Sequence, residues 1–148
     1  MRLSKKSRYG LRALIDLSVH SKTEHVSLNN IAERNGISLQ YLEQVFASLR
    51  RAGIVKSVKG PQGGYLLGYP AAKITVSQIL EALEGPYEIE KEELSEGDEA
   101  QGMSVAIQKL VIDQINEKLK EVLDHVTLED LESEYLYYNE YSQDMYYI

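Results

Sequence analysis

The sequence predicts a mainly α-helical protein with one small β-hairpin, which places it in the α+β class. Three features of the 148-residue chain indicate this class. Apolar residues recur at helical spacing along most of the chain. A glycine-rich stretch at residues 60–64 separates two short strand-like segments, as in a hairpin. Residues 104–126 form one long periodic segment, which predicts an additional helix beyond the first domain.

The first two helices are predicted from apolar periodicity and from capping residues. The first covers residues 8–20, with its apolar stripe at Leu11, Leu14, Ile15 and Val19. The second begins after Ser27, whose hydroxyl can accept a hydrogen bond from a free backbone N–H. It ends at Asn35-Gly36, because glycine readily adopts the left-handed conformation that ends helices.

A third helix is predicted between Ser38, a second capping residue, and Gly53. Its core-facing residues are Leu42, Val45, Phe46 and Leu49. Its opposite face is polar and basic and carries Gln40, Tyr41, Glu43, Gln44, Ser48, Arg50 and Arg51. Two short helices joined by a tight turn, the second with such a face, are typical of a helix-turn-helix.

A β-hairpin is predicted next. Residues 54–59 form the first strand, residues 60–64 the turn and residues 65–67 the returning strand. Lys56 and Lys59 flank the glycine-rich tip, and glycines allow a backbone to approach a phosphate closely. A hairpin in this position is the wing of a winged helix-turn-helix.

The segment after the hairpin predicts one more helix and then a linker. Thr75 and Gln78 have the spacing of a capping box, and Gly85-Pro86 ends the helix. Residues 88–102 are acidic, with Lys91 as the only base. Like charges repel, so we expect an extended and mobile loop here.

The long periodic segment predicts a coiled-coil-like seam. The seam consists of Val105, Gln108, Ile112, Ile115, Leu119, Val122 and Val126. Pairing with a second copy would cover it; the alternative is packing back onto the same chain. A short helix is expected at residues 127–136, followed by a tail rich in tyrosine. The expected domains are therefore 1–86, a linker at 87–103, and a dimerisation helix with its tail at 104–148.

Charge is distributed unevenly along the chain. Through Leu66 there are eleven Lys and Arg residues against four Asp and Glu, a net charge of +7, so the remainder carries −14 to give the total of −7. A local basic face attracts phosphate even when the whole chain is acidic. This asymmetry favours a nucleic-acid partner for the first half.

Several function classes are excluded or disfavoured by composition. The chain has no cysteine, which excludes disulfides, thiolate metal sites and cysteine nucleophiles. No convergent nucleophile–base set or phosphate loop can be identified, so we expect no enzyme activity, no cofactor and no metal. No apolar run approaches the ~18 residues of a membrane span. The basic start is not followed by an apolar run, so we expect no signal peptide and a cytoplasmic location.

The expected DNA contacts follow from the third helix and the wing. Side chains at the start of such a helix reach base edges and phosphates, whereas wing lysines neutralise phosphates. The candidates are Ser38, Gln40, Tyr41, Glu43, Gln44, Arg50, Arg51, Lys56, Lys59, Gly60, Gln62 and Gly63. Ser38 can instead be a plain helix cap, and Glu43 a solvated surface residue. A winged-helix module that binds proteins is the alternative function.

Three motifs resemble the Rrf2 family of bacterial winged-helix regulators. They are RYGL at residues 8–11, SLQYLEQ at residues 38–44 and GPQGGYLLG at residues 60–68. The resemblance covers residues 1–86 and implies a winged-helix domain followed by a long dimerisation helix. It also points to Ser38, Gln40 and Glu43 as DNA contacts. Many members hold an iron–sulfur cluster through three cysteines before the long helix, but the corresponding residues 88–102 contain none.

Within the family, the cysteine-free pattern resembles the CymR type, which represses genes of cysteine metabolism. The similar segments are LEGP at 83–86, EVLD at 121–124, TLEDL at 127–131 and the final Tyr146-Tyr147-Ile148. That type works with cysteine synthase (CysK), whose active site accepts C-terminal peptides ending in isoleucine. The resemblance thus implies a partner-binding tail at Tyr146, Tyr147 and Ile148. Two alternatives stay open: a tail folded on its own dimer, and control by a small effector bound between the winged domain and the long helix.

Overall fold

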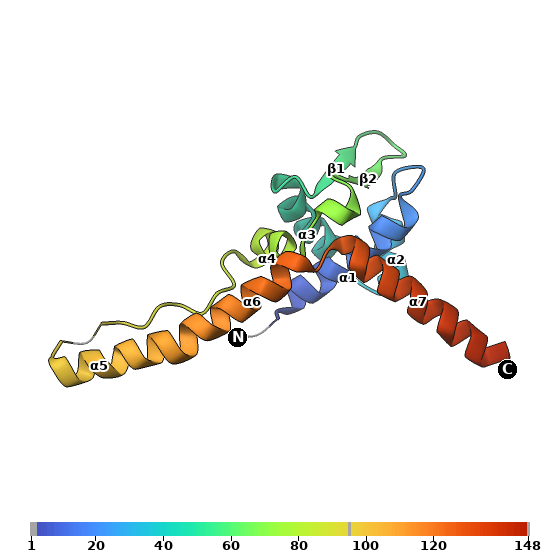
Figure 1. Ribbon diagram of the computed structural model, residues 1–148. Helices are drawn as coiled ribbons and strands as arrows, with labels where there is room; N and C mark the ends of the chain where they lie inside the picture. The colour runs from blue at the N-terminus through green and yellow to red at the C-terminus, as the bar shows by residue number, and fades with distance from the viewer. Residues whose placement is uncertain (1–2, 95, 148) are drawn as a thin grey trace.

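The computed structural model describes residues 3–94 and 96–147, with backbone alone for residues 143–147. Its N-terminal part contains three helices in the predicted order: α1 (Lys5–His20), α2 (Leu28–Asn35) and α3 (Leu39–Arg51) (Figure 1). Helix α1 begins three residues earlier than predicted, because the hydroxyl of Ser4 accepts a hydrogen bond from the backbone N–H of Ser7.

The predicted caps of α2 and α3 are confirmed. The hydroxyls of Ser27 and Ser38 each accept a hydrogen bond of 3.2 Å from the backbone N–H three residues further on. Gly36 ends α2 with a φ of 63°, in the left-handed region that favours glycine. The turn between the two helices is therefore held by local interactions at both of its ends.

The predicted hairpin is present as β1 (Val55–Val58) and β2 (Gly64–Leu67). The strands are antiparallel, with Val55 opposite Leu67 and Val58 opposite Gly64. On its other side β2 forms a single β-bridge to Val26, through backbone N–O distances of 2.8 and 3.0 Å to Tyr65. A Cβ on Gly64 would lie 2.3 Å from the carbonyl oxygen of Val26, so this approach requires glycine.

Two further short elements complete the head, the name used here for α1 to α4 with the hairpin. They are η1 (Ala71–Lys73) and α4 (Val76–Glu84), the latter with the predicted capping box of Thr75 and Gln78. Helix α4 packs closely on α1, since a Cβ on Gly10 would lie 2.4 Å from Cδ1 of Leu83. The largest fully buried side chains of the head belong to Phe46, Leu14, Leu17, Ile31, Leu42 and Leu49.

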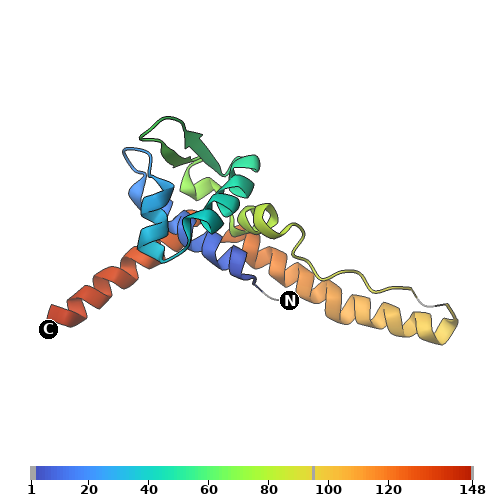
Figure 2. The ribbon, with the colours of Figure 1, turned by 180° about the vertical axis from the view of Figure 1, so that it is seen from behind.

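A long helical rod projects from the head (Figures 1 and 2). It consists of α5 (Asp98–Ile107), the π-helical segment η2 (Gln108–Ile112) and α6 (Asp113–His125). The predicted start at Ser104 is wrong. The helix begins at Asp98, where Gly97 has a φ of 106° and Asp98 and Glu99 place negative charge in the first turn. We call the described linker residues 85–94 and 96–97, together with α5, η2 and α6, the arm.

The linker is extended, as predicted, but it is bound along the rod (Figures 1 and 2). The Asn116 side chain donates to the carbonyl of Ile89 and accepts from its N–H, both at 2.9 Å. The backbone N–H of Glu92 donates to Oε1 of Gln108 at 2.7 Å. Two side-chain amides of the rod thus satisfy backbone groups of the linker, a contact that the sequence did not predict; the mobility of the loop stays a prediction.

The C-terminal segment is one helix, α7 (Leu128–Tyr147), which extends beyond the short helix expected at residues 127–136 into the tyrosine-rich tail. Thr127 caps it: its hydroxyl accepts from the N–H of Asp130 at 3.1 Å, and the Asp130 carboxylate accepts from the N–H of Thr127 at 3.0 Å. After Leu128 the sequence contains neither glycine nor proline, so nothing local interrupts the helix.

The beginning of α7 is joined to the head. Thr75 and Thr127 form a β-bridge, and Leu128 is fully buried in the same core as the α1 and α3 residues. The Glu132 carboxylate accepts from Ser18 at 2.6 Å and pairs with Lys22 at 2.7 Å. The core of the head thus includes residues beyond the boundary expected at residue 86.

Within residues 3–94 and 96–147, no helix has both the length and the apolar character that crossing a lipid bilayer requires.

Candidate nucleic-acid interface

The outer face of α3 is polar and open to solvent. Gln40, Glu43 and Gln44 are exposed, as are Arg50 and Arg51 at its C-terminal end. The inner face is anchored, because Leu42, Val45, Phe46 and Leu49 are fully buried. A rigid helix with an unoccupied polar face and a basic end can enter a DNA groove.

Ser38 and Tyr41, at the start of α3, each have a second role in the protein. The Ser38 side chain is exposed, but its oxygen already accepts the capping hydrogen bond, which leaves its O–H to donate. Tyr41 is half-buried and packs edge-on against Tyr9 of α1, with ring centroids 5.8 Å apart. Lys5 lies over that Tyr9 ring, 5.4 Å from its centroid.

A basic group that the sequence did not single out lies beside α3. Lys6 of α1 donates to the Ser48 hydroxyl at 3.4 Å, and Arg51 donates to the same oxygen at 3.2 Å. Two basic side chains from different helices therefore meet at the buried Ser48 hydroxyl. Lys6 contributed to the charge count, but spacing along the sequence gives no sign that it lies next to Arg51.

The wing holds its predicted residues at the surface. Lys56, Lys59, Gly60 and Gln62 are exposed, and Gly63 is half-buried. Gly60 has a φ of 119°, and a Cβ on Gly63 would lie 2.3 Å from the carbonyl oxygen of Val58. Both glycines are therefore required by the turn itself.

An aromatic contact fixes the wing relative to α3. The rings of Phe46 and Tyr65 have centroids 4.9 Å apart and an angle of 65° between their planes. Phe46 is fully buried on the inner face of α3, and Tyr65 lies in β2. This contact packs the returning strand of the wing against the inner face of the helix.

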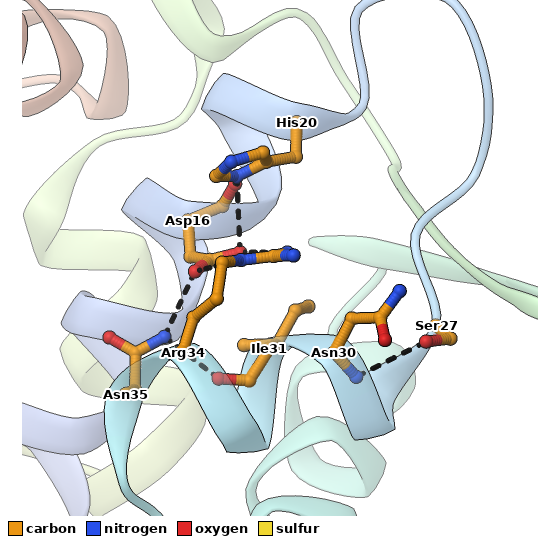
Figure 3. Close-up of polar contacts among 7 residues, drawn as sticks. All are labelled: Asp16, His20, Ser27, Asn30, Ile31, Arg34 and Asn35. Atoms are coloured by element: carbon orange, nitrogen blue, oxygen red, sulfur yellow. Dashed lines mark hydrogen bonds and ion pairs between the residues drawn. The ribbon is translucent and has the colours of Figure 1, made fainter.

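Helix α2 is tied to α1 by a polar cluster around Asp16 (Figure 3). Arg34 donates two hydrogen bonds to the Asp16 carboxylate, at 2.7 and 3.0 Å, and Asn35 donates a third at 3.0 Å. Nδ1 of His20 lies 3.3 Å from the same carboxylate. The hydrogen bond to Asp16, supported by the Asp16 and Tyr135 charges, raises the pKa of Arg34 although burial opposes this.

The cluster pairs one acidic and one basic group of the N-terminal half, Asp16 and Arg34. The Asp16 side chain is 9% exposed, and Asp16 is one of just four acidic residues before Leu66. Because Arg34 pairs with it, the acidic charge is compensated locally and does not oppose the exposed basic groups of α3 and the wing.

Comparisons with known proteins identify the family. Residues 3–134 match the Rrf2 family, described as iron-dependent transcriptional regulators. The chain belongs to the Rrf2 family. Its relatives include the transcriptional regulator IscR of Erwinia tasmaniensis, 40% identical over 131 residues, which span 88% of this chain and 78% of that protein. IscR of Xenorhabdus nematophila is 39% identical over 88% of this chain and 79% of that protein.

Solved structures show the same fold. CymR of B. subtilis, called the global cysteine regulator of that organism, is 41% identical, with a TM-score of 0.75 over 90% of this chain and 97% of that one. IscR of T. potens is 39% identical, with a TM-score of 0.71 over 90% and 88% of the two chains. The mainly helical winged helix-turn-helix predicted from the sequence is confirmed, and this Rrf2 protein is a DNA-binding transcriptional regulator.

The residues of this Rrf2 protein do not fit a thiolate-held iron–sulfur cluster. The chain has no cysteine. Across residues 3–94 and 96–147, no group of three or more His, Asp or Glu side chains is arranged to hold a metal ion. The three histidines are spread out: His20 lies beside Asp16, His25 beside the wing, and His125 donates to the Glu121 carbonyl.

The expected dimerisation residues lie in different environments in the protomer. Val105, Ile115 and Val122 are exposed, with Val122 at 58%. Leu119 and Val126 are half-buried, and Ile112 is 6% exposed. The exposed apolar surface of the arm also includes Leu94, Met103, Ile107, Leu110 and Val111.

The π-helical segment η2 contains both buried and exposed apolar residues of the rod. A π-turn holds one residue more than an α-turn, so it rotates the side chains on either side relative to an unbroken α-helix. In this segment Gln108 binds the linker and Ile112 is buried, whereas Leu110 is 68% exposed. In the predicted heptad, Leu110 lies opposite the seam, which agrees with its exposure. The tail residues proposed from the resemblance cannot be compared, since Ile148 and the side chains of Tyr146 and Tyr147 lie outside the described residues.

Proposed function

We propose that this Rrf2 protein is a homodimeric repressor that binds a palindrome-like operator. The observation that carries the proposal is the exposed polar face of α3, with Phe46 and Tyr65 linking it to a glycine-tipped wing. The exposed apolar residues of the arm support a dimer, because such a surface is stable when a second copy covers it. Two recognition helices related by a two-fold axis read a palindrome.

The proposed roles of the DNA-binding residues differ between helix and wing. Base edges are read from the start of α3, by Ser38, Gln40, Tyr41, Glu43 and Gln44. Phosphates are contacted by Arg50, Arg51, Lys56, Lys59, Gly60 and Gly63, and Gln62 at the wing tip enters a minor groove. Glu43 is the one acidic residue of α3, which suits acceptance from a cytosine amino group.

The first experiment measures sequence preference and salt dependence together. Operators are selected from genomic fragments, and binding of the selected duplex is followed by fluorescence anisotropy. Gln40→Ala is expected to weaken operator binding by about 1–3 kcal/mol and to relax preference at one base pair. Lys118→Ala, on α6 and paired with Glu121, serves as the control with unchanged binding. Equal affinity for every duplex would refute sequence-specific recognition.

The proposed target genes belong to cysteine and sulfur metabolism. The support is the similarity to the CymR proteins of B. subtilis and S. aureus, at 41% and 38% identity over 97% and 96% of those chains. Selected fragments should therefore lie upstream of sulfur-assimilation genes, and reporter expression from them should rise when the regulator is deleted. Selection of unrelated promoters would contradict this part of the proposal.

We propose further that regulation involves no iron–sulfur cluster. The absence of cysteine supports this, because such clusters are held by thiolates. Protein purified without oxygen and supplied with iron and sulfide should show no visible absorption of a cluster, and its operator affinity should not change. A bound cluster in that reconstitution would overturn the proposal.

The proposed regulatory partner is cysteine synthase, bound through the tail Tyr146-Tyr147-Ile148. The proposal requires Ile148 to carry a free carboxylate, which a pocket can capture together with its apolar side chain. Because α7 runs to Tyr147, its last turn has to unwind to insert as an extended peptide. Deleting Ile148 should abolish co-elution with cysteine synthase, whereas Ile148→Val should retain most of it. Unchanged co-elution without Ile148 would contradict tail docking.

A small-molecule effector is the second candidate for regulation. A cavity of about 390 Å³ lies where α4 ends and the linker begins, lined by Glu81, Gly85, Pro86, Tyr87 and Glu88. Its walls connect the head with the arm, so a bound ligand would affect both. A metabolite that shifts operator affinity in the absence of cysteine synthase, and loses this effect in Tyr87→Ala, would favour this mechanism.

A further inference from the structure

The loop between α1 and α2 contacts the wing at two successive residues. Val26 forms the β-bridge to Tyr65, at the start of the returning strand. The preceding residue, His25, lies further toward the tip, where its Nε2 is 2.5 Å from the carbonyl oxygen of Gln62. A carbonyl oxygen can only accept, so Nε2 of His25 carries the proton and donates it.

The tip of the wing has few other restraints. The last paired residues of the strands are Val58 and Gly64. Beyond them, the hydrogen bonds within the described residues are one from the N–H of Gly63 to the carbonyl of Gly60, at 3.0 Å, and the one from His25. A turn with three glycines has a large conformational freedom, and an isolated two-stranded hairpin is only marginally stable.

The loop that carries His25 is anchored where it leaves α1. There Lys22 pairs with Glu132 of α7 at 2.7 Å, and the Glu132 carboxylate also accepts from Ser18. Glu132 itself is buried where α7 packs against the head. The imidazole thus reaches the wing from a loop anchored at both ends, which makes it a restraint on the tip.

We propose that His25 is a positioning residue for DNA binding, which holds the wing tip in the shape that presents Lys59 and Gln62 to the duplex. Because this hydrogen bond already orders the tip, less conformational entropy is lost when the wing binds DNA. The proposal rests on the assignment of the wing as a DNA contact made above. It adds a residue that lies outside both the recognition helix and the hairpin.

The test compares three variants in operator binding. His25→Ala should weaken binding by about 3- to 10-fold, the effect of losing one hydrogen bond. His25→Gln should keep most of the affinity, because its amide nitrogen can donate from a position similar to Nε2. Thr23→Ala, at an exposed position of the same loop, is the matched control and should bind as the wild type.

Two further readouts separate positioning from a general loss of structure. Hydrogen exchange at the Gly63 amide should become faster in His25→Ala, while the midpoint of thermal unfolding stays within a few degrees of the wild type. The double variant His25→Ala/Lys59→Ala should bind less weakly than the product of the two single effects predicts, because both act through the same contact.

The outcomes distinguish this inference from the function on which it rests. If Lys59→Ala and Lys56→Ala bind as the wild type, the wing is no DNA contact and the proposed function is wrong in that part. If those variants weaken binding but His25→Ala does not, the inference about His25 is overturned. Fully additive effects of His25→Ala and Lys59→Ala would overturn it as well.

Discussion

The head and the arm differ in how far their large apolar side chains are buried. In the head, side chains such as Phe46, Leu42 and Leu49 are fully buried by neighbouring helices. In the arm, large apolar side chains such as Leu94, Met103 and Leu110 are exposed by more than half of their area. The head and the start of α7 thus form a closed core, whereas the arm has an apolar surface that the proposed second copy would cover.

The largest effect is expected from placing charge on the arm. Leu110→Asp combined with Ile115→Asp puts two carboxylates on exposed apolar positions of the arm, which should raise the dimer dissociation constant by about 100-fold or more. Sedimentation velocity across a dilution series measures this. The apolar exchanges Leu110→Met and Ile115→Val are the matched control and should leave the dimer intact. An unchanged dissociation constant in the charged variant would show that another surface mediates association.

The second prediction concerns the junction where α7 enters the core of the head. Leu128 is fully buried there, so Leu128→Ala should lower the free energy of unfolding by about 2–5 kcal/mol. Leu136→Ala, two turns further along the same helix and 42% exposed, should cost less than about 1 kcal/mol. Urea titrations of both variants test the contrast. Equal losses would mean that α7 is not part of the core of the head.

A smaller effect is expected from the carboxylate that ties α7 to α1. Burial raises the pKa of Glu132, but hydrogen bonds from Lys22 and Ser18 and the charge of Lys22 outweigh it, so the pKa is lowered overall. A lowered pKa in the folded state stabilises the protein above the ordinary glutamate pKa of about 4.3, and this contribution is lost as the pH falls through the folded-state value.

The variant Glu132→Gln therefore provides a pH test. At pH 7 it should be less stable than the wild type by about 1–2 kcal/mol. The difference should shrink as the pH falls below about 4, since the wild-type carboxyl is then protonated as well. Thermal unfolding of both proteins between pH 3 and 7 measures the gap. A gap that stays constant over this range would argue against an ionised Glu132 in the folded protein.

The smallest effect is expected within the arm itself. Asn116→Ala removes both hydrogen bonds to the backbone of Ile89, so the Ile89 amide should exchange with solvent about 10-fold faster or more. The global free energy of unfolding should change by less than about 1 kcal/mol, because the linker contributes little to the core. Gln114→Ala, an exposed position on the same helix, is the control. Unchanged exchange at Ile89 would mean that other contacts hold the linker.

The sequence predicts the head well because its signals are local. Ser27, Gly36 and the pair of Thr75 and Gln78 act on backbone groups within a few residues, so their effect can be predicted from spacing alone. The same holds for the glycines of the wing. The helix-turn-helix and the hairpin follow from these signals together with apolar periodicity.

The features that were missed depend on contacts between distant residues. The bridge of Thr75 with Thr127 and the contact of His25 with Gln62 join segments 52 and 37 positions apart, and no periodic pattern reports them. The π-helical segment of the arm was also missed, because a π-turn leaves no clear mark in the order of apolar residues. The length of α7 was missed for another reason: a tyrosine-rich, acidic segment does not show the apolar stripe of a buried helix.

The rod of the arm also acts as a lever. Its 28 residues from Asp98 to His125 span about 42 Å at the rise of an α-helix. A rotation of about 5° where α6 leaves the head displaces the far end by roughly 4 Å. In a dimer joined through two such rods, a small change of angle at Val126 alters the separation of the two recognition helices. Operator half-sites are spaced by about 34 Å per turn of DNA, so a shift of this size corresponds to roughly one base pair of half-site spacing.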